Sequence, residues 1–256
     1  MEGILVGCNQ AQEWLLPWWW LHYRLHNKHP VTFIDFGMSE PAKKWCQEKG
    51  NWISLDVSED FIAGKEEIDP ITALTWEGFY RGNNFWPGRL GWFKKPFALL
   101  KTPYQRTIWI DLDCQIRADL SALFALCQNP VGIALVRDRD PGAINRDLDF
   151  GLIFEEEVVY NSGLIVYEKD SPAIAEFAKR ARERNREFIG DQHLLSRILY
   201  EQKHKPLELP RRYNRWKWDK PHADTAIYHW VNEEGKAVIR KSLSALNPLF
   251  FNRLAR

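Results

Sequence analysis

The sequence predicts an α/β protein with a mostly parallel, Rossmann-like central sheet and helices on both of its faces. Short apolar runs at residues 4–6, 31–36 and 52–55 alternate with helical segments at 11–27 and 39–50. Such alternation is typical of βαβ units, in which a helix joins two parallel strands. No internal repeat or linker interrupts the pattern.

Local signals support each of the N-terminal elements. Gly3 and Gly7 bound the first apolar run, as expected of a short buried strand. Ser39 is a suitable N-cap for a helix that has Pro41 in its first turn and ends at Gly50. A length of 256 residues suits one large domain, and we expect a single domain over residues 1–256.

The rest of the chain continues the alternation after a long interruption. Residues 56–91 are rich in Gly and Pro and are expected to be irregular, and a loop of this length is usually functional. The charged stretch 137–157 is also expected to be a loop. The further expected helices are 93–101, 119–127, 171–186 and 191–202, and the further expected strands are 107–110, 131–136, 158–167 and 225–231.

Composition excludes several classes of protein. Lys and Arg number 35 against 34 Asp and Glu, which argues against a protein that coats nucleic acid. The four cysteines lack C-x-x-C spacing, so we expect reduced thiols in a cytoplasmic protein. The apolar run 14–21 is too short to cross a bilayer and is interpreted as an aromatic core helix. The alternative is a face that docks peripherally on a membrane.

Two carboxylates follow the apolar strand at 107–110. Asp111 and Asp113 are separated by one residue, and ligands bind beyond the carboxyl ends of parallel strands. Two close carboxylates repel each other unless a cation or hydrogen-bond donors lie between them. Their hard oxygens suit Mg²⁺ or Mn²⁺, ions that bridge to phosphates. The alternative is a polar strand end that caps a turn.

Asn161, Ser162 and Gly163 interrupt an otherwise good strand. Residues that break a local rule at one point often mark a functional site, and the amide of Asn161 suits sugar hydroxyls. The alternative is a bulge or a turn.

Two more polar positions have a structural and a functional interpretation. Asp191, followed by Gln192, opens a helix and is explained most simply as an N-cap. His229 near the end of the last strand is either a packed core histidine or a metal ligand. A nitrogen ligand beside two carboxylates would favour Mn²⁺ over Mg²⁺.

Taken in order, these motifs resemble the family 8 glycosyltransferases, which have the GT-A fold. Lys95 stands 16 residues before Asp111, as the lysine of that family does. The other matching segments are Tyr104-Gln105-Arg106, Asp119-Leu120-Ser121-Ala122-Leu123-Phe124, Tyr160-Asn161-Ser162-Gly163, Gly190-Asp191-Gln192, Leu209-Pro210 and Tyr213-Asn214. The resemblance covers residues 3–232, which is most of the chain.

The resemblance implies an enzyme that moves a hexose from a nucleotide-diphosphate sugar, foremost a UDP-sugar, with retention at the anomeric carbon. The implied acceptor is a glycan, a glycolipid or a protein, and nucleic acid is not an expected partner. The implied metal is Mn²⁺, or Mg²⁺, held by Asp111, Asp113 and His229. The ion would assist departure of the nucleotide diphosphate as a Lewis acid.

The resemblance also implies roles at the donor and at the reacting carbon. The implied catalytic residues are Asp191, Gln192 and Asn161, and because Gln192 is a poor nucleophile we expect same-face attack with Asp191 positioning the sugar. The implied donor-binding residues are Asn9, Lys95, Asp111, Leu112, Asp113, Asn161, Ser162, Asp191, Gln192 and Lys236.

Two departures from the family pattern motivate rival hypotheses. Residues 8–12 lack the Asp and Tyr that meet uracil in the family, which leaves Asn9 to contact a base. No glycine follows His229 at the family's spacing, and Lys236 stands one residue late. The first rival is therefore a non-catalytic carbohydrate-binding protein on a decayed transferase fold. The second is a sugar nucleotidyltransferase, although residues 7–10 do not supply its Gly-rich phosphate loop.

The segment 211–218 alternates arginines and a lysine with aromatic residues. It is interpreted as a platform for an acceptor that carries phosphate or lipid. The alternative is a surface segment whose Trp side chains pack inward.

Overall fold

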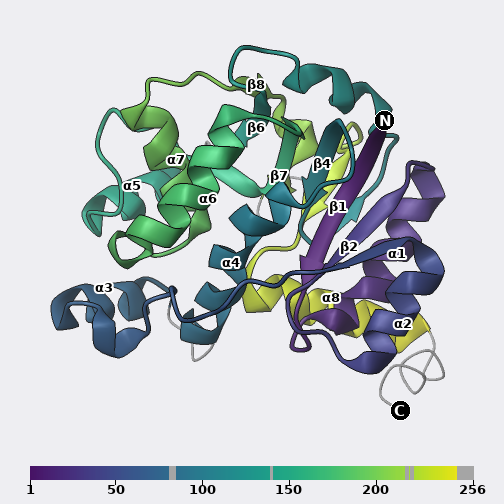
Figure 1. The fold of residues 1–256 in the computed structure, drawn as a ribbon, viewed down its shortest axis with the longest axis horizontal. Helices are drawn as coiled ribbons and strands as arrows, with labels where there is room; N and C mark the ends of the chain where they lie inside the picture. Colours follow the sequence, from purple (N-terminus) through teal and green to yellow (C-terminus); the bar gives the residue numbers. More distant parts are fainter. Residues whose placement is uncertain (81–84, 139–140, 217–218, 220–221, 247–256) are drawn as a thin grey trace.

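The computed structural model describes residues 1–80, 85–138, 141–216, 219 and 222–246. These residues form a central seven-stranded sheet in the order β3-β2-β1-β4-β7-β6-β8 (Figure 1). Its strands are β1 (Glu2–Cys8), β2 (Val31–Asp35), β3 (Asn51–Ser54), β4 (Arg106–Ile110), β6 (Ile133–Arg137), β7 (Tyr160–Glu168) and β8 (Leu207–Leu209).

The central sheet is mostly parallel, as predicted. β1 pairs in parallel with β2 and β4, and the pairs β2–β3 and β6–β8 are also parallel. Among the described strands of this sheet only β7 runs the other way, and it lies between β4 and β6. The amino end of β7 therefore lies beside the carboxyl end of β4, which brings two polar motifs together.

Helices cover both faces of this sheet. The α-helices are α1 (Leu16–His26), α2 (Glu40–Lys49), α3 (Pro70–Tyr80), α4 (Phe85–Leu100), α5 (Pro141–Asp149), α6 (Pro172–Arg184), α7 (Asp191–Glu201) and α8 (Asn232–Leu246). The shorter 3-10 helices are η1 (Glu13–Leu15), η2 (Lys65–Glu67), η3 (Ser121–Cys127), η4 (Asn185–Glu187) and η5 (Arg211–Tyr213).

Successive residues of β1 face opposite sides of the sheet, because side chains alternate along a strand. Ile4 and Val6 pack in the apolar cluster that includes residues of α1 and α2. Leu5 packs in the cluster that includes residues of α4, α6 and α7. The prediction of helices on both faces is confirmed.

A second sheet of three short strands lies in the order β5-β10-β9. Its strands are β5 (Cys114–Ile116), β9 (Arg215–Trp216) and β10 (Ile227–His229). The strand expected at 225–231 is thus shorter than predicted and belongs to this second sheet. β5 and β9 were not predicted, since strands of two or three residues carry almost no periodicity.

Several expected loops are helical. The stretch 56–91 contains α3 and the first turns of α4, and the stretch 137–157 contains α5. In α3, Ala73, Trp76 and Phe79 recur at helical spacing and pack in one cluster, which outweighs the unfavourable Gly78. The helix expected at 119–127 is the 3-10 helix η3.

The interpretation of residues 14–21 as an aromatic core helix is confirmed. Trp18 and Trp19 of α1 are 3% and 0% exposed and pack in the core cluster. These two rings are therefore not available on a membrane-facing surface. Within the part of the chain that the structure describes, no helix is both long and apolar enough to cross a membrane.

Arg89 of α4 joins the segment before α3 to the segment before α7. Its guanidinium is 1% exposed and donates to the carbonyl oxygens of Ala63 (2.7 Å), Asn185 (2.7 Å), Phe188 (2.9 Å) and Ile189 (3.3 Å). Burial lowers the pKa of Arg89 to about 10, so the side chain stays charged at neutral pH.

We expect Arg89→Met to lower the free energy of unfolding by about 3 kcal/mol, because it leaves several buried carbonyl groups without a donor. Urea unfolding followed by circular dichroism measures the change. The matched control is Arg186→Met, since the Arg186 side chain is 65% exposed and pairs with Glu67 on the surface. That change should cost less than about 1 kcal/mol. Equal losses in the two variants would contradict a special role for Arg89.

Candidate active site

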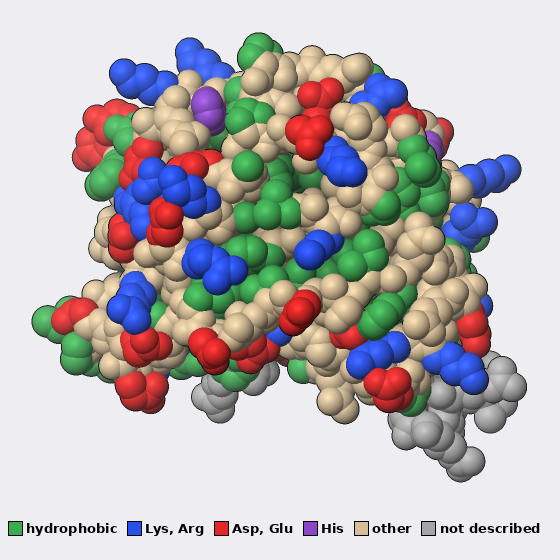
Figure 2. Space-filling view, in the orientation of Figure 1, with side chains coloured by type: hydrophobic (Ala, Val, Ile, Leu, Met, Phe, Trp, Pro, Cys, Tyr) green, Lys and Arg blue, Asp and Glu red, His purple; other side chains and the backbone are tan. Residues whose placement is uncertain are grey.

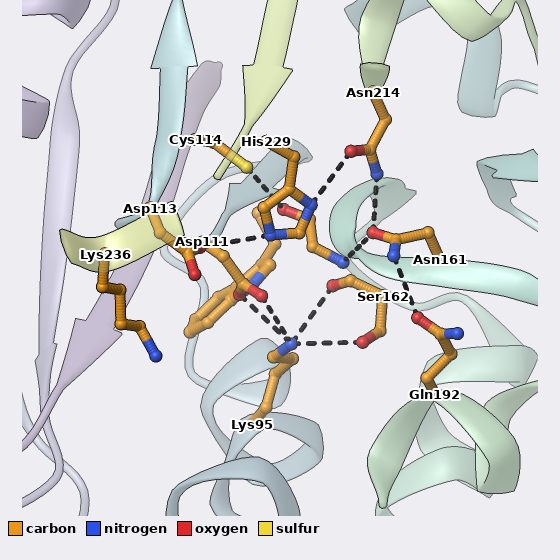
Figure 3. Close-up of polar contacts among 12 residues, drawn as sticks. Lys95, Asp111, Asp113, Cys114, Asn161, Ser162, Gln192, Asn214, His229 and Lys236 are labelled. Atoms are coloured by element: carbon orange, nitrogen blue, oxygen red, sulfur yellow. Dashed lines mark hydrogen bonds and ion pairs between the residues drawn. The ribbon is translucent and has the colours of Figure 1, made fainter. Parts of the chain in front are cut away.

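The polar residues that the sequence singled out meet where β4, β5, β7 and β10 approach one another. Asp111 and Asp113 lie between the end of β4 and the start of β5. The main-chain N–H of Asp111 donates to the carbonyl oxygen of Gly163 at 2.8 Å, which joins the D-x-D and N-S-G motifs. Figure 3 shows the side chains of these segments converging with those of α4, α7 and α8.

Lys95 is the central cation of the site. Its Nζ lies 3.1 Å from Oδ1 of Asp111 and 2.9 Å from Oδ2 of Asp191. It also donates to the carbonyl oxygen of Ser162 at 3.2 Å and to Oγ of Ser162 at 3.3 Å. Burial disfavours the charged form, but Asp111 and Asp191 outweigh this and raise the pKa of Lys95 above its ordinary value.

Asp191 is not an N-cap. The N-cap of α7 is Gly190, and Asp191 is the first residue of the helix. Its side chain is buried and ion-paired with Lys95, where the positive end of the helix dipole also favours a negative charge. The simple capping interpretation of Asp191 is therefore wrong.

Asp113 and His229 form a second close pair of polar side chains. Nε2 of His229 lies 3.1 Å from Oδ1 of Asp113, and both side chains are largely buried. Burial opposes ionisation of Asp113, yet His229 and Lys236 outweigh it and hold the pKa of Asp113 below its ordinary value. The interpretation of His229 as a packed core histidine does not describe this polar environment.

The Asp113–His229 pair fits a divalent cation. Asp113, Cys114 and His229 each offer one ligand atom, and these atoms lie within 4.8 Å of one another. Burial raises the pKa of the Cys114 thiol well above its ordinary value, and its Sγ contacts the carbonyl oxygen of Gly163. The carboxylate oxygen of Asp113 and the imidazole nitrogen of His229 are a donor pair that suits Mn²⁺.

Asp111, the third predicted ligand, is directed elsewhere. Its Oδ1 accepts a hydrogen bond from Nε1 of Trp109 at 2.6 Å, and both oxygens lie near Nζ of Lys95. Two hydrogen bonds do not exhaust the lone pairs of a carboxylate. The Asp111 side chain is therefore held by Lys95 and Trp109, and none of the contacts described for it joins it to His229.

Asn161 lies at the middle of a chain of side-chain hydrogen bonds (Figure 3). Its Nδ2 donates to Oε1 of Gln192 at 3.0 Å, and its Oδ1 accepts from the main-chain N–H of Gly163 at 2.9 Å. Nδ2 of Asn214 donates to the same Oδ1 at 2.6 Å. Oδ1 of Asn214 lies 3.0 Å from Nδ1 of His229, which connects this chain to the Asp113–His229 pair.

Lys236 reaches the site from α8 despite its unexpected spacing. Asn232, which replaces the glycine of the family pattern, has a φ of 66°. Asn is the residue besides Gly that best tolerates this left-handed conformation, so the turn is preserved. Lys236 follows within the first turns of α8, and its charge acts on Asp113.

Two predicted donor-binding residues lie outside this polar network. Leu112 is 4% exposed and packs in the core cluster. Asn9 follows β1, and its Oδ1 is buried without a hydrogen-bond partner among the described residues. The Asn9 side chain thus retains a free acceptor within this part of the chain.

Asn214 and Cys114 lie in the site but were not among the residues predicted from the sequence. Asn214 is 0% exposed, and its only signal was the Tyr213-Asn214 match to the family pattern. Cys114 had no signal beyond its position after Asp113. Both are brought to the site by the second sheet, which local periodicity does not predict.

The aromatic-basic segment is partly described. Trp216 is 8% exposed and packs beneath the guanidinium of Arg211, whose Cζ is 5.1 Å from the ring centroid. This agrees with the alternative in which Trp side chains pack inward. Residues 217–218 lie outside the described part of the chain.

Figure 2 shows the face that Figure 1 views, with hydrophobic side chains exposed across its middle and Lys and Arg side chains among them. Acidic side chains lie along the lower border of this band. Apolar surface beside cations is suited to ligands that combine flat, weakly polar faces with negative charge.

Comparison with known proteins identifies the fold. The sequence matches no protein-family model and no curated protein. Among solved structures, it is similar to the galactosyltransferase LgtC in complex with donor and acceptor sugar analogues, with a TM-score of 0.60 and 14% identity over 91% of this chain and 88% of that one.

Two further solved structures agree. Mouse xyloside xylosyltransferase 1 has a TM-score of 0.56 and 16% identity over 92% of this chain and 99% of that one. The glycosyltransferase GlyE of Streptococcus pneumoniae has a TM-score of 0.59 and 13% identity over 91% of this chain and 55% of that one. The predicted fold is confirmed: the chain has the GT-A fold of these glycosyltransferases.

Proposed function

We propose that this protein is a metal-dependent glycosyltransferase that moves a hexose from a nucleotide-diphosphate sugar, with retention at the anomeric carbon. The observation that carries the proposal is the convergence of the Asp113–His229 pair with the Lys95–Asp111–Asp191 cluster at the strand ends of a GT-A fold. The solved complex of LgtC with donor and acceptor sugar analogues supports a nucleotide-sugar donor and a sugar acceptor. The acceptor is a glycan, a glycolipid or a protein.

Asp113 and His229 would hold Mn²⁺, or Mg²⁺, with Asp111 as the predicted third ligand. When bound, such an ion supplies Lewis-acid stabilisation of the departing diphosphate. The positive charges of Lys95 and Lys236 act in the same direction, because both side chains lie beside the carboxylates of the site.

Asp191, Asn161 and Gln192 would position the donor sugar. Nζ of Lys95 lies 2.9 Å from Oδ2 of the buried Asp191 and holds that side chain in place, where it can accept hydrogen bonds from sugar hydroxyls. The amide groups of Asn161 and Gln192 provide both donors and acceptors. Since none of these side chains is an activated nucleophile, the acceptor would attack from the face that the diphosphate leaves.

Asn9 would contact the base. Its buried, unpartnered Oδ1 is an acceptor, and the N3–H of uracil is a donor of the matching kind. UDP is therefore the first nucleotide to test. The four cysteines are free and buried, which suits the reducing conditions of a cytoplasm.

The first experiment measures thermal stability with UDP, GDP, CDP or ADP, each with and without Mn²⁺. A ligand at 100 times its dissociation constant should stabilise the fold by about 2.7 kcal/mol. A shift with one nucleotide that requires the metal identifies the base, and the sugar donors of that base are then screened for hydrolysis and transfer. No shift with any nucleotide, together with glycan binding, would favour the non-catalytic rival.

We expect Asp113→Asn to weaken Mn²⁺ binding at least tenfold, because the substitution removes an anionic ligand. Isothermal titration calorimetry with Mn²⁺ alone measures this change without any donor. The control is Asp170→Asn, since Asp170 is exposed just after the end of β7. Unchanged metal affinity and unchanged transfer in Asp113→Asn would contradict the proposed metal site.

A further inference from the structure

The hydrogen-bond chain from Gly163 to His229 has a single consistent direction. The main-chain N–H of Gly163 can only donate, so the atom of Asn161 that it contacts must be the oxygen. Nδ2 of Asn161 is then the group that donates to Gln192. The backbone of β7 therefore fixes the orientation of the Asn161 amide.

The orientation of the Asn214 amide follows from that of Asn161. Because Oδ1 of Asn161 accepts, the atom of Asn214 that lies 2.6 Å away must be its Nδ2. Oδ1 of Asn214 is left to face Nδ1 of His229 at 3.0 Å, and an oxygen requires that this nitrogen carry the proton. Nε2 of His229 lies 3.1 Å from a carboxylate oxygen of Asp113, to which it donates in the metal-free protein, and a cation held by Asp113 would take the place of that proton.

We propose that Asn214 is a positioning residue that fixes the proton of His229 on Nδ1 and thereby presents Nε2 to the metal. This inference rests on the proposed metal site. A histidine binds a metal through one nitrogen while the other usually donates a hydrogen bond that sets the tautomer and the ring orientation. Asn214 supplies that acceptor here, in place of the more common carboxylate or main-chain carbonyl.

Burial makes the arrangement effective. Asn214 is 0% exposed, and Asn161 and His229 are 4% and 5% exposed, so water does not compete for these hydrogen bonds. Gly163 contacts the ring from the side, since a Cβ at that position would lie 2.2 Å from Cε1 of His229. The ring is thus held by Asn214 on one nitrogen, Asp113 on the other, and the backbone of β7 between them.

The test compares Asn214→Leu with Asn214→Asp. Leu removes the acceptor for Nδ1–H, whereas Asp keeps an oxygen there but replaces the donor to Asn161 by a second carboxylate oxygen. Two quantities are measured: the dissociation constant for Mn²⁺ alone, by calorimetry, and the hydrogen-bonded Nδ1–H of His229 in the metal-free protein, by ¹H–¹⁵N NMR. His229→Gln identifies the His229 signal among those of the seven histidines.

We expect wild type and Asn214→Asp to show a hydrogen-bonded Nδ1–H signal of His229, and Asn214→Leu to lose it. Mn²⁺ affinity should fall by about 10- to 100-fold in Asn214→Leu, the usual cost of removing the partner of a ligating histidine. Asn214→Asp should recover most of that affinity. Asn27→Leu is the matched control: Asn27 is a buried, hydrogen-bonded Asn between α1 and η3, and its loss should lower stability but not metal affinity.

Two outcomes separate this inference from the proposed function. Retention of wild-type Mn²⁺ affinity and of the hydrogen-bonded Nδ1–H signal in folded Asn214→Leu would overturn the role of Asn214 while leaving the metal site intact. Absence of Mn²⁺ binding in the wild type would overturn the metal site and the inference together.

Discussion

Lys95→Met should abolish glycosyl transfer and destabilise the protein, because it leaves the buried Asp191 and the partly exposed Asp111 without their shared cation. Removing one partner of a buried ion pair typically costs about 3–5 kcal/mol. Transfer should fall by roughly 100-fold or more, since a preorganised charge at the reacting centre is worth that much. Urea unfolding and donor-dependent transfer measure the two effects.

The neighbouring lysine provides the control. Lys94 is also largely buried, but its partner Glu59 is 52% exposed and can be solvated when Lys94 is removed. Lys94→Met should therefore cost less stability than Lys95→Met. The double variant Lys95→Met/Asp191→Asn should recover part of the lost stability without recovering transfer, because one uncompensated buried charge is gone. Full transfer activity in folded Lys95→Met would refute the assigned role.

Much of the fold follows from local sequence signals. Short apolar runs predict β1, β2 and β4, because these strands are buried on both faces, and the cap at Ser39 predicts α2. The helices α3 and α5 were missed, since their Gly, Pro and Asp content resembles a loop. Only tertiary packing, as of Trp76 and Phe79 in the third apolar cluster, selects the helix there.

Part of the candidate site could likewise be predicted from the sequence, and part could not. Lys95, Asp111 and Asp191 were selected from the sequence, and the structure brings all three together. Asn214 escaped selection because its role depends on a contact with Asn161, 53 residues earlier in the chain, and no spacing rule predicts such a contact. The pairing of Asp113 with His229, 116 residues apart, was implied by the family resemblance and not by any local pattern.

Gly163→Ala should be nearly as damaging as the loss of Lys95. A Cβ at Gly163 would lie 2.2 Å from Cε1 and 2.8 Å from Nδ1 of His229, so the ring would have to move. Movement would break the hydrogen bond to Asn214 and the contact with Asp113, both of which hold the ring in place. We expect Mn²⁺ affinity to fall by about 100-fold, since one ligand is displaced and the other loses its partner.

Calorimetry with Mn²⁺ alone measures that affinity, and far-UV circular dichroism verifies that the variant is folded. The control is Gly91→Ala in α4, because a Cβ at Gly91 meets no atom within 4 Å. Ala should be neutral there or stabilise the helix by up to about 1 kcal/mol. Wild-type metal affinity in Gly163→Ala would mean that His229 is not the ligand, because a ring forced out of its place cannot present Nε2 to the same ion. The glycine of the N-S-G motif is thus explained by the space that the imidazole of His229 needs, and not by the conformation of β7.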